Sequence, residues 1–417
     1  MVRAAIGYPM PADPATPGER PGGAGRVASI DLLRGLVMIV MALDHVRDFT
    51  SRSAMQGSPT DLATTTAAVF FTRWITHICA PAFALAAGLA AWLWWQQHGD
   101  RRALSRFLVT RGLWLMALEI GVMQFAYYFA WPVTAPVLLL VLWSLGLSMV
   151  ALAGLAWLPR PAILVVALAA ILCHPLLDPL QASSFGAAAG IWNILHQVGA
   201  FPVGSAVVAT PYPLIPWAGV MALGFALAPV FHRPQGRRVR TLLALGIAAL
   251  TIFVLLRVGN AYGDPVPWQA GPDSLRTVMS FLNVSKYPAS PAFLAMTLGL
   301  AFLLLGLFEC DRARARPDGI LLTLGRVPLV FYILHFFAAH LFATLLWFAI
   351  YGPSAASFTF LPYPSFGGPR GAFPADFGLP LWGSYVVWLA VLAAVYPLCS
   401  RFSRFRAERQ YWWLRYL

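Results

Sequence analysis

Long apolar stretches separated by polar connections dominate the chain. A helix needs about 20 apolar residues to cross a bilayer, and ten stretches reach or approach that length. The second and the ninth are long enough to tilt or to break. We therefore expect an all-α, polytopic integral membrane protein with about ten transmembrane helices. The predicted segments cover approximately residues 30–49, 67–95, 104–129, 136–157, 161–179, 212–231, 241–258, 290–308, 323–349 and 381–399.

The connections between these stretches alternate between two classes, and this alternation predicts the topology. One class is short and rich in arginine, as at 233–240, and the other is mostly longer and poor in basic residues, as at 180–211. Because basic connections stay in the cytoplasm, we expect both termini there. The first outer connection departs from the rule, since it carries Arg47, Arg52 and Arg73. The predicted parts are a disordered cytoplasmic tail at 1–25, a transmembrane domain at 26–400 and a basic cytoplasmic tail at 401–417.

The composition supports a location in lipid and argues against a nucleic-acid partner. The 417 residues are 59% hydrophobic and only 11% charged, whereas a soluble domain has roughly a quarter charged residues. The net charge of +13 comes from short clusters between apolar runs, as membrane topology requires. Lys286 is the only lysine among 29 basic residues, which, with abundant Ala, Gly and Pro, indicates a GC-rich bacterial genome. We therefore expect a bacterial cytoplasmic (inner) membrane protein.

The first apolar stretch, SIDLLRGLVMIVMALDHVRDF (29–49), carries charged residues at both ends. Eleven helical steps separate Arg34 from His45, which places them on one face and about 16 Å apart. Asp31 can pair with Arg34, and Asp48 with His45, because each pair has the i, i+3 spacing. Charged groups in a membrane helix face the protein interior or a wet cavity, so we expect Arg34 and His45 to face one interior pathway.

His45 is the strongest candidate for chemistry in this helix. Asp44 and Asp48 flank it, and neighbouring carboxylates orient an imidazole and raise its basicity, as a general base requires. The alternative is that Arg34 extends to lipid head groups and that residues 44–48 form a hydrated helix end. We favour the functional interpretation of His45, because an ionisable group inside a membrane helix marks a functional site by default.

The motif SIDLLRG, followed by His45 with ten residues after Arg34, resembles the transmembrane acyltransferase superfamily. In its acyltransferase-three branch, Arg and His with this spacing lie on the first helix of a ten-helix core, and the His is held to be catalytic. The rest of the chain is similar to the heparan-α-glucosaminide N-acetyltransferase branch, through HICAPAFALAAG (77–88). PYPLIPWAGVMALG (211–224) and GRVPLVFYILHFFAAH (325–340) resemble segments of uncharacterised bacterial relatives.

This resemblance implies an acyltransferase that moves an acyl group, most simply acetyl, from cytoplasmic acyl-CoA to a hydroxyl or amine. A bacterial chain would use an envelope glycan, a glycolipid or an amino sugar as acceptor. Acetyl-CoA is then the donor, membrane lipids surround the protein, and no metal is required. Our candidate catalytic residues are His45, Asp48, Asp44 and Arg34, and our candidates for binding substrate or donor are Asp31, Arg47, His77, His335, Tyr332 and Arg326.

Two relatives suggest two positions for the base. The lysosomal enzyme of the second branch has Asn at the position of His45, Asp at that of His77, and its catalytic His in the following loop. No residue of this chain matches that loop His, and the direct match of Arg34 and His45 to the first branch favours His45. Direct transfer and a route through an acyl-His intermediate both remain open.

Two functions without chemistry compete with the enzyme. A transporter or flippase of lipids or glycans would also use broken helices and central polar residues, and an accessory scaffold would need no reactive His. Transporters built from inverted repeats show matching halves, and the sequence shows none. The spacing of Arg34 and His45 therefore favours the enzyme, while the sequence predicts no particular oligomeric state.

Overall fold

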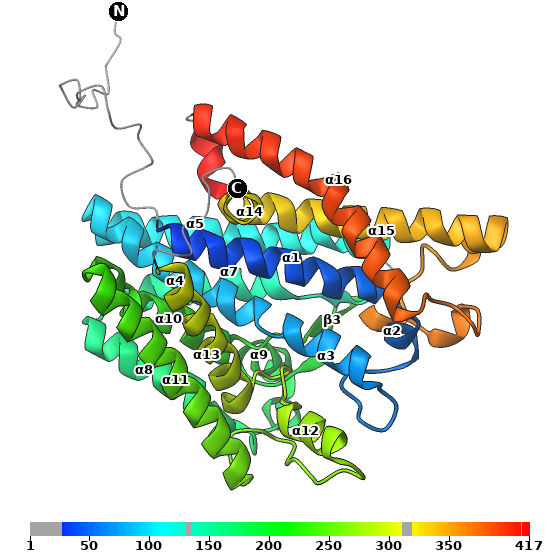
Figure 1. Ribbon diagram of the computed structural model, residues 1–417, viewed down its shortest axis with the longest axis horizontal. Helices are drawn as coiled ribbons and strands as arrows, with labels where there is room; N and C mark the ends of the chain where they lie inside the picture. The colour runs from blue at the N-terminus through cyan, green and yellow to red at the C-terminus, as the bar shows by residue number, and fades with distance from the viewer. Residues whose placement is uncertain (1–26, 131–134, 311–318, 410) are drawn as a thin grey trace, which may run out of the picture.

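The computed structural model describes residues 27–130, 135–310, 319–409 and 411–417, and most of them are helical (Figure 1). The predicted tail at 1–25 lies outside the described residues. Each of the ten predicted apolar segments contains a helix, so the all-α prediction is confirmed. The main helices are α1 (Ala28–Thr50), α3 (Ala67–Thr76), α4 (Cys79–His98), α5 (Arg101–Leu118), α7 (Val141–Leu155), α8 (Arg160–Leu172), α10 (Leu214–Leu227), α11 (Gln235–Gly259), α13 (Pro291–Phe308), α14 (Ile320–Arg326), α15 (Pro328–Tyr351) and α16 (Leu381–Glu408).

Seven helical stretches of the described chain are long and apolar enough to cross a membrane. They lie at Ala67–His98, Arg101–Tyr128, Leu214–His232, Gln235–Gly259, Pro291–Phe308, Pro328–Ser357 and Leu381–Glu408. Two further apolar helices, α7 and α8, are shorter. Helix α1 has 23 residues but carries charged groups at both ends. The chain is therefore a multi-pass helical membrane protein.

Helix α1 runs through the middle of the bundle (Figure 1). On one side it packs against α14, α15 and α16, and on the other it contacts α3, α4 and α13. All of its residues from Ser29 to Thr50 are buried or partly buried, the charged ones included. The polar groups of α1 therefore face protein, as its charges require.

Two predicted segments are broken where proline lies near the start of the second helix. The second segment divides into α3 and α4, with His77 at the junction and Pro81 in the first turn of α4. The ninth divides into α14 and α15, with Pro328 as the first residue of α15. Proline is tolerated in a first helical turn because that turn has no internal partner for its N–H. The first of these breaks brings His77 to the functional site described below.

Helices α4 and α10 approach each other closely at two glycines. A Cβ atom on Gly88 would lie 1.9 Å from the Met221 carbonyl oxygen, and one on Gly224 would lie 2.2 Å from the Leu85 carbonyl oxygen. Only glycine allows the two backbones to meet at this distance. Close contact through small residues is a common means of packing helices in lipid, where apolar burial provides little driving force.

A turn of π-helix and a small sheet complete the frame around the site. The turn, η1 (Glu119–Met123), places the Glu119 carboxylate where Tyr127 Oη donates to it at 2.6 Å and the Leu142 N–H at 2.8 Å. Glu119 thus accepts from the first turn of α7. The sheet has the strand order β1-β3-β2, with β1 parallel to β3 and β2 antiparallel to it. Its strands are β1 (Val137–Leu138), β2 (Gly199–Val203) and β3 (Ala206–Thr210), and the remaining short helices are α2 (Arg52–Gln56), α6 (Gln124–Tyr128), α9 (Ala189–Leu195) and α12 (Ser274–Leu282).

Candidate functional site

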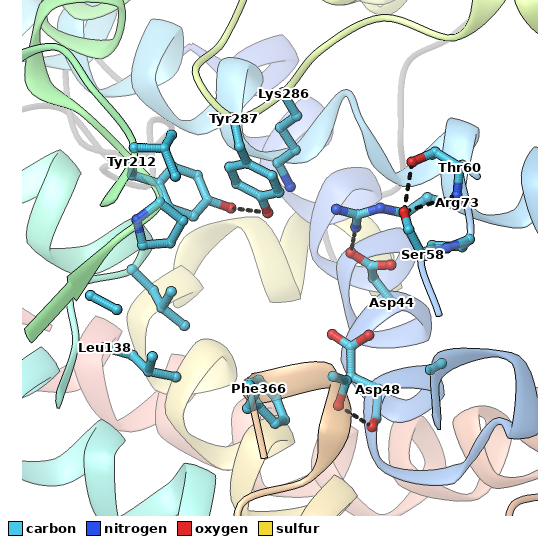
Figure 2. A pocket seen from close by; sticks show the side chains of 18 of the residues that line it. Asp44, Asp48, Ser58, Thr60, Arg73, Leu138, Tyr212, Lys286, Tyr287 and Phe366 are labelled. Atoms are coloured by element: carbon cyan, nitrogen blue, oxygen red, sulfur yellow. Dashed lines mark hydrogen bonds and ion pairs between the residues drawn. The ribbon is translucent and has the colours of Figure 1, made fainter. Parts of the chain in front are cut away.

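A cavity of about 1030 Å³ lies at the C-terminal end of α1. Its walls come from the last two turns of α1, the junction of α3 and α4, the small sheet, helix α15 and the connections around residues 283–287 and 364–370. Figure 2 shows polar side chains from several of these elements pointing into the same space. Six of the sequence candidates line it, together with Arg73 of α3: Asp44, His45, Arg47, Asp48, His77 and Tyr332.

The two carboxylates at the C-terminal end of α1 contact arginines rather than His45. Arg47 Nη2 donates to Asp44 Oδ1 at 2.9 Å and to Asp48 Oδ1 at 3.1 Å, and Arg73 Nη1 donates to Asp44 Oδ2. The expected contact of Asp48 with His45 is therefore wrong. The guanidinium groups outcompete the imidazole, because an ion pair with a hydrogen bond is stronger than a bond to a neutral ring. Arg73, which broke the charge rule for outer connections, belongs to this network.

Arg47 keeps unused hydrogen-bonding capacity at the cavity wall. Its side chain is only 3% exposed, and its Nε and Nη1 atoms have no hydrogen-bond partner among the described residues. His77 Nδ1 is buried and likewise has no partner there. Buried polar atoms without partners are uncommon in proteins and indicate water or a ligand at the site. Both residues line the cavity and were candidates for substrate binding.

His45 contacts a second histidine that is distant in sequence. Its Nδ1 atom lies 2.8 Å from His335 Nε2, and His335 Nδ1 lies 2.9 Å from the Phe331 carbonyl oxygen. The His45 ring stacks on Phe336, with 4.0 Å between centroids. His335 is completely buried, whereas His45 is partly exposed and lines the cavity together with Tyr332. The structure thus brings three of the candidates together through the packing of α1 against α15.

The cavity also contains residues that sequence reasoning missed. Lys286 Nζ lies over the rings of Tyr212 and Tyr287, at 5.6 and 5.2 Å from their centroids, and the two phenol oxygens are 3.2 Å apart (Figure 2). The positive charges of Lys286 and Arg73 hold the pKa of Tyr287 below its usual value. Burial raises the pKa of Tyr212. The signal in the sequence was Lys286 itself, the only lysine in the chain.

A second group of candidates lies at the opposite end of α1. Arg34 Nη1 is 3.5 Å from Asp31 Oδ1, which confirms the predicted pair, and Arg34 Nη2 donates to the Ala86 carbonyl at 2.9 Å. The Arg326 carbonyl accepts from Arg406 Nη1 at 2.8 Å. Arg111 is within electrostatic range of both Arg34 and Arg406. Arginine residues are therefore concentrated at the N-terminal end of α1.

The cavity does not extend to this second group. Its lining among the described residues includes His45 but not Arg34. Met38 and Met41, which lie between the two on α1, are buried in the hydrophobic core. The expectation that Arg34 and His45 face one continuous pathway is therefore not met in this structure, because the methionine side chains pack the interior between them.

The catalytic domain of heparan-alpha-glucosaminide N-acetyltransferase is the family whose model matches the chain, over residues 26–259. This range is more than half of the 417 residues. The chain belongs to this family. No curated protein matches it. The resemblance found in its motifs to the heparan-α-glucosaminide N-acetyltransferase branch is thus confirmed, and the chain is a multi-pass membrane protein of an acetyltransferase family.

The match to the heparan-α-glucosaminide N-acetyltransferase family covers one part of the site. It runs from the start of α1 to the end of α11 and includes His45, Arg73 and His77. Lys286 and His335 lie beyond the matched range. The cavity is therefore built from a segment typical of the family together with α15 and a connection that the match does not cover.

Proposed function

We propose that this protein transfers an acyl group, most simply acetyl, from acyl-CoA to a hydroxyl or amine of an acceptor held in the cavity. One observation carries the proposal: in a chain of an acetyltransferase family, a partly exposed His45 lines a cavity of about 1030 Å³. His45 is the proposed general base. The acceptor class is an envelope glycan, a glycolipid or an amino sugar, in the bacterial inner membrane.

The proposed reaction needs few groups, because a thioester is already activated. The acceptor oxygen or nitrogen bonds to the acyl carbon, the C–S bond breaks, and the acceptor proton passes to His45 and then to the CoA thiolate. Arg73 and Lys286 place positive charge at the cavity and support the oxyanion that forms on the thioester oxygen. The free donors of Arg47 and the unpartnered Nδ1 atom of His77 are available to hydroxyl groups of an acceptor, which both donate and accept.

We assign Asp44 and Asp48 a different role from the one expected. Both hold Arg47, and Asp44 also holds Arg73, so they balance and orient cations in the cavity wall. Asp48 keeps one oxygen atom outside this pair and is partly exposed, so it is also available to an acceptor. Their contribution to the reaction is thus to position the arginines.

We propose that the donor binds from the arginine-rich end of α1 and that this end is cytoplasmic. Arg34, Arg111 and Arg406 suit the phosphates of CoA, with Asp31 and Arg326 beside them. The start of α1 and the C-terminus lie at the same end of the bundle (Figure 1), which supports cytoplasmic placement of both. The seven apolar spans, α1, α7 and α8 then give the proposed ten crossings, with residues 401–417 on the cytoplasmic side.

The interior between Arg34 and His45 is filled, so the proposed donor path requires a movement of side chains. The thioester of a donor held near Arg34 reaches His45 only after Met38 and Met41 move. Methionine side chains are unbranched and flexible, and they repack readily. Displacement of these two side chains by the pantetheine arm is therefore part of the proposal.

The test uses purified full-length protein in lipid vesicles with labelled acetyl-CoA and a set of amino sugars and glycolipids. We expect thioester consumption and acetylated product, both reduced about 100-fold or more in His45→Ala, as loss of a general base requires. His98→Ala, an exposed histidine at the end of α4, is the matched control and should retain activity. Movement of an acceptor across the bilayer without thioester consumption would instead support the transporter, and full activity in His45→Ala would remove His45 from the mechanism.

A quench with donor alone distinguishes the two chemical routes. An acyl-His intermediate predicts one acetyl group on His45 by mass spectrometry before any acceptor is added. Direct transfer predicts no such adduct and requires donor and acceptor to be bound together. His77→Ala serves as the comparison, since His77 is the second histidine of the cavity lining.

A further inference from the structure

Three groups form a continuous line of hydrogen bonds that ends at the cavity. The Phe331 carbonyl oxygen lies 2.9 Å from His335 Nδ1, and His335 Nε2 lies 2.8 Å from His45 Nδ1. His335 is 0% exposed, whereas His45 lines the cavity. The only other nitrogen of the line, His45 Nε2, is the one that remains for a substrate.

The protons in this line can be placed from the chemistry of its first member. A carbonyl oxygen only accepts, so His335 Nδ1 must carry the proton of the first bond. His335 is fully buried between a carbonyl and another imidazole, and such surroundings favour the neutral ring. Its Nε2 is then a lone pair and an acceptor. The proton of the second bond therefore belongs to His45 Nδ1, and His45 Nε2 is unprotonated.

Aromatic packing holds both rings in this arrangement. His335 stacks on Phe331 at 5.1 Å with an interplanar angle of 11°, and His45 stacks on Phe336 at 4.0 Å. The rings of Tyr332 and His45 form a T-shaped pair, with 6.2 Å between their centroids and an interplanar angle of 88°. Rotation of either ring would break a hydrogen bond and a stacking contact together. The geometry is therefore fixed by the packing of α15 rather than by a carboxylate.

We propose that His335 is a positioning residue that fixes His45 in the Nδ1–H tautomer and thereby directs the His45 Nε2 lone pair to the acceptor. The inference rests on the proposed function of His45 as base and names the group that orients it. In the transfer, the acceptor proton moves to His45 Nε2 as the new bond to the acyl carbon forms. His45 then carries two protons, of which the one on Nδ1 stays bonded to His335 Nε2, and the Nε2 proton goes to the departing thiolate.

This arrangement is consistent with the lack of a hydrogen bond from His45 to either Asp44 or Asp48, its neighbours on α1. Asp44 and Asp48 are engaged by Arg47, and Asp44 also by Arg73, so they are not available to orient the ring. The Phe331 carbonyl orients the neutral His335 ring, and His335 in turn orients His45. This arrangement places no further charge in the interior. Burial of a charge without a partner is costly, whereas this line carries no charge and both ring nitrogens of the buried His335 have a partner.

The first experiment compares two substitutions of His335 in the full-length protein in lipid. In His335→Gln, the amide oxygen reaches about the position of Nε2 and still accepts from His45 Nδ1–H, so kcat should stay within roughly 10-fold of wild type. In His335→Leu, no acceptor remains, and kcat should fall about 100-fold with KM for the acceptor little changed. His340→Leu is the matched control, since His340 is equally buried on α15 but bonds the Ala126 carbonyl. It should retain kcat.

The second experiment observes the tautomer directly and does not depend on activity. In protein labelled with ¹⁵N-histidine, at a pH where imidazoles are neutral, the His45 resonances should show a protonated Nδ1 and an unprotonated Nε2. His45→Ala identifies these resonances among the eight histidines. The pattern should persist in His335→Gln and in His340→Leu, and should shift toward the Nε2–H form in His335→Leu.

The outcomes separate this inference from the proposed function. An Nε2–H tautomer of His45 in the wild type, or a kcat of His335→Leu within about twofold of wild type while His45→Ala is inactive, would overturn the role of His335 alone. Equal losses in His335→Gln and His335→Leu with an unchanged tautomer would do the same, since they indicate a structural defect. If the wild type shows the Nδ1–H tautomer of His45 but His45→Ala keeps full activity, the proposed function would be overturned instead.

Discussion

Replacing Gly88 by alanine should separate α4 from α10 and lower the stability of the protein. The added Cβ would lie 1.9 Å from the Met221 carbonyl oxygen and 2.8 Å from the Phe225 nitrogen. Both neighbours are backbone atoms of α10 and cannot rotate away. Real Cβ atoms keep at least 3.0 Å from such atoms, so the two helices must move apart by about 1 Å at this point.

The size of the effect follows from two opposing contributions. Overpacking of a filled interior costs typically 1–3 kcal/mol, and this contact is at the severe end because backbone meets backbone. Alanine in place of glycine stabilises a helix by about 1 kcal/mol, which offsets part of that loss. Gly88→Ala should therefore lower the free energy of unfolding by about 1–2 kcal/mol, and Gly224→Ala should behave alike, since its Cβ would lie 2.2 Å from the Leu85 carbonyl.

The assay is the apparent melting temperature of protein in detergent, followed by size-exclusion chromatography after heating. Gly154→Ala on α7 is the matched control, because nothing lies within 4 Å of its added Cβ. It should leave the melting temperature unchanged or slightly raised. A Gly88→Ala variant that is as stable as the control would refute the close contact of α4 and α10.

Three further measurements test the polar contacts of the site and its frame. Asp44→Asn and Arg73→Gln should each lower the apparent melting temperature strongly, since removing one partner of a buried ion pair costs roughly 3–5 kcal/mol. The double variant should lose less stability than the sum of the two single variants, and strict additivity would contradict the pairing. Glu119→Leu leaves N–H groups at the start of α7 without an acceptor, at about 1–3 kcal/mol each, so hydrogen exchange there should accelerate, unlike in Glu119→Gln. The Tyr287 phenol should ionise at lower pH than free tyrosine, which a pH titration followed by tyrosinate absorbance would detect. This early ionisation step should be absent in Tyr287→Phe and should move to higher pH in Lys286→Met.

The helices could be predicted from sequence because lipid imposes a simple rule on them. Each segment needs a long apolar run, and proline near a junction marks a break, as at Pro81 and Pro328. The small sheet and α12 (Ser274–Leu282) carry no comparable signal, since they are short and lie in the connections. Their positions depend on contacts between distant segments, and all three strands of the sheet contribute to a wall of the cavity.

The candidate site was predictable one residue at a time but not as an arrangement. The chemistry of His45 and of His335 drew attention to each separately, yet 290 positions separate them and only the packing of α1 on α15 makes them neighbours. Local spacing gave the correct pair at Asp31 and Arg34. It failed at Asp48, because Arg47 on the same turn and Arg73 from α3 supply stronger partners for the carboxylates.

The position of Lys286 gives this protein a single reactive amine in the wall of its cavity. It is the only lysine among the 417 residues, and its amine stands beside Tyr212 and Tyr287 in the lining. An amine-reactive dye therefore has a single side chain to modify, and its label on Lys286 is read separately from that on the α-amino group by peptide mapping. Labelling that slows when the cavity is filled would report occupancy in real time, with no residue introduced by mutagenesis.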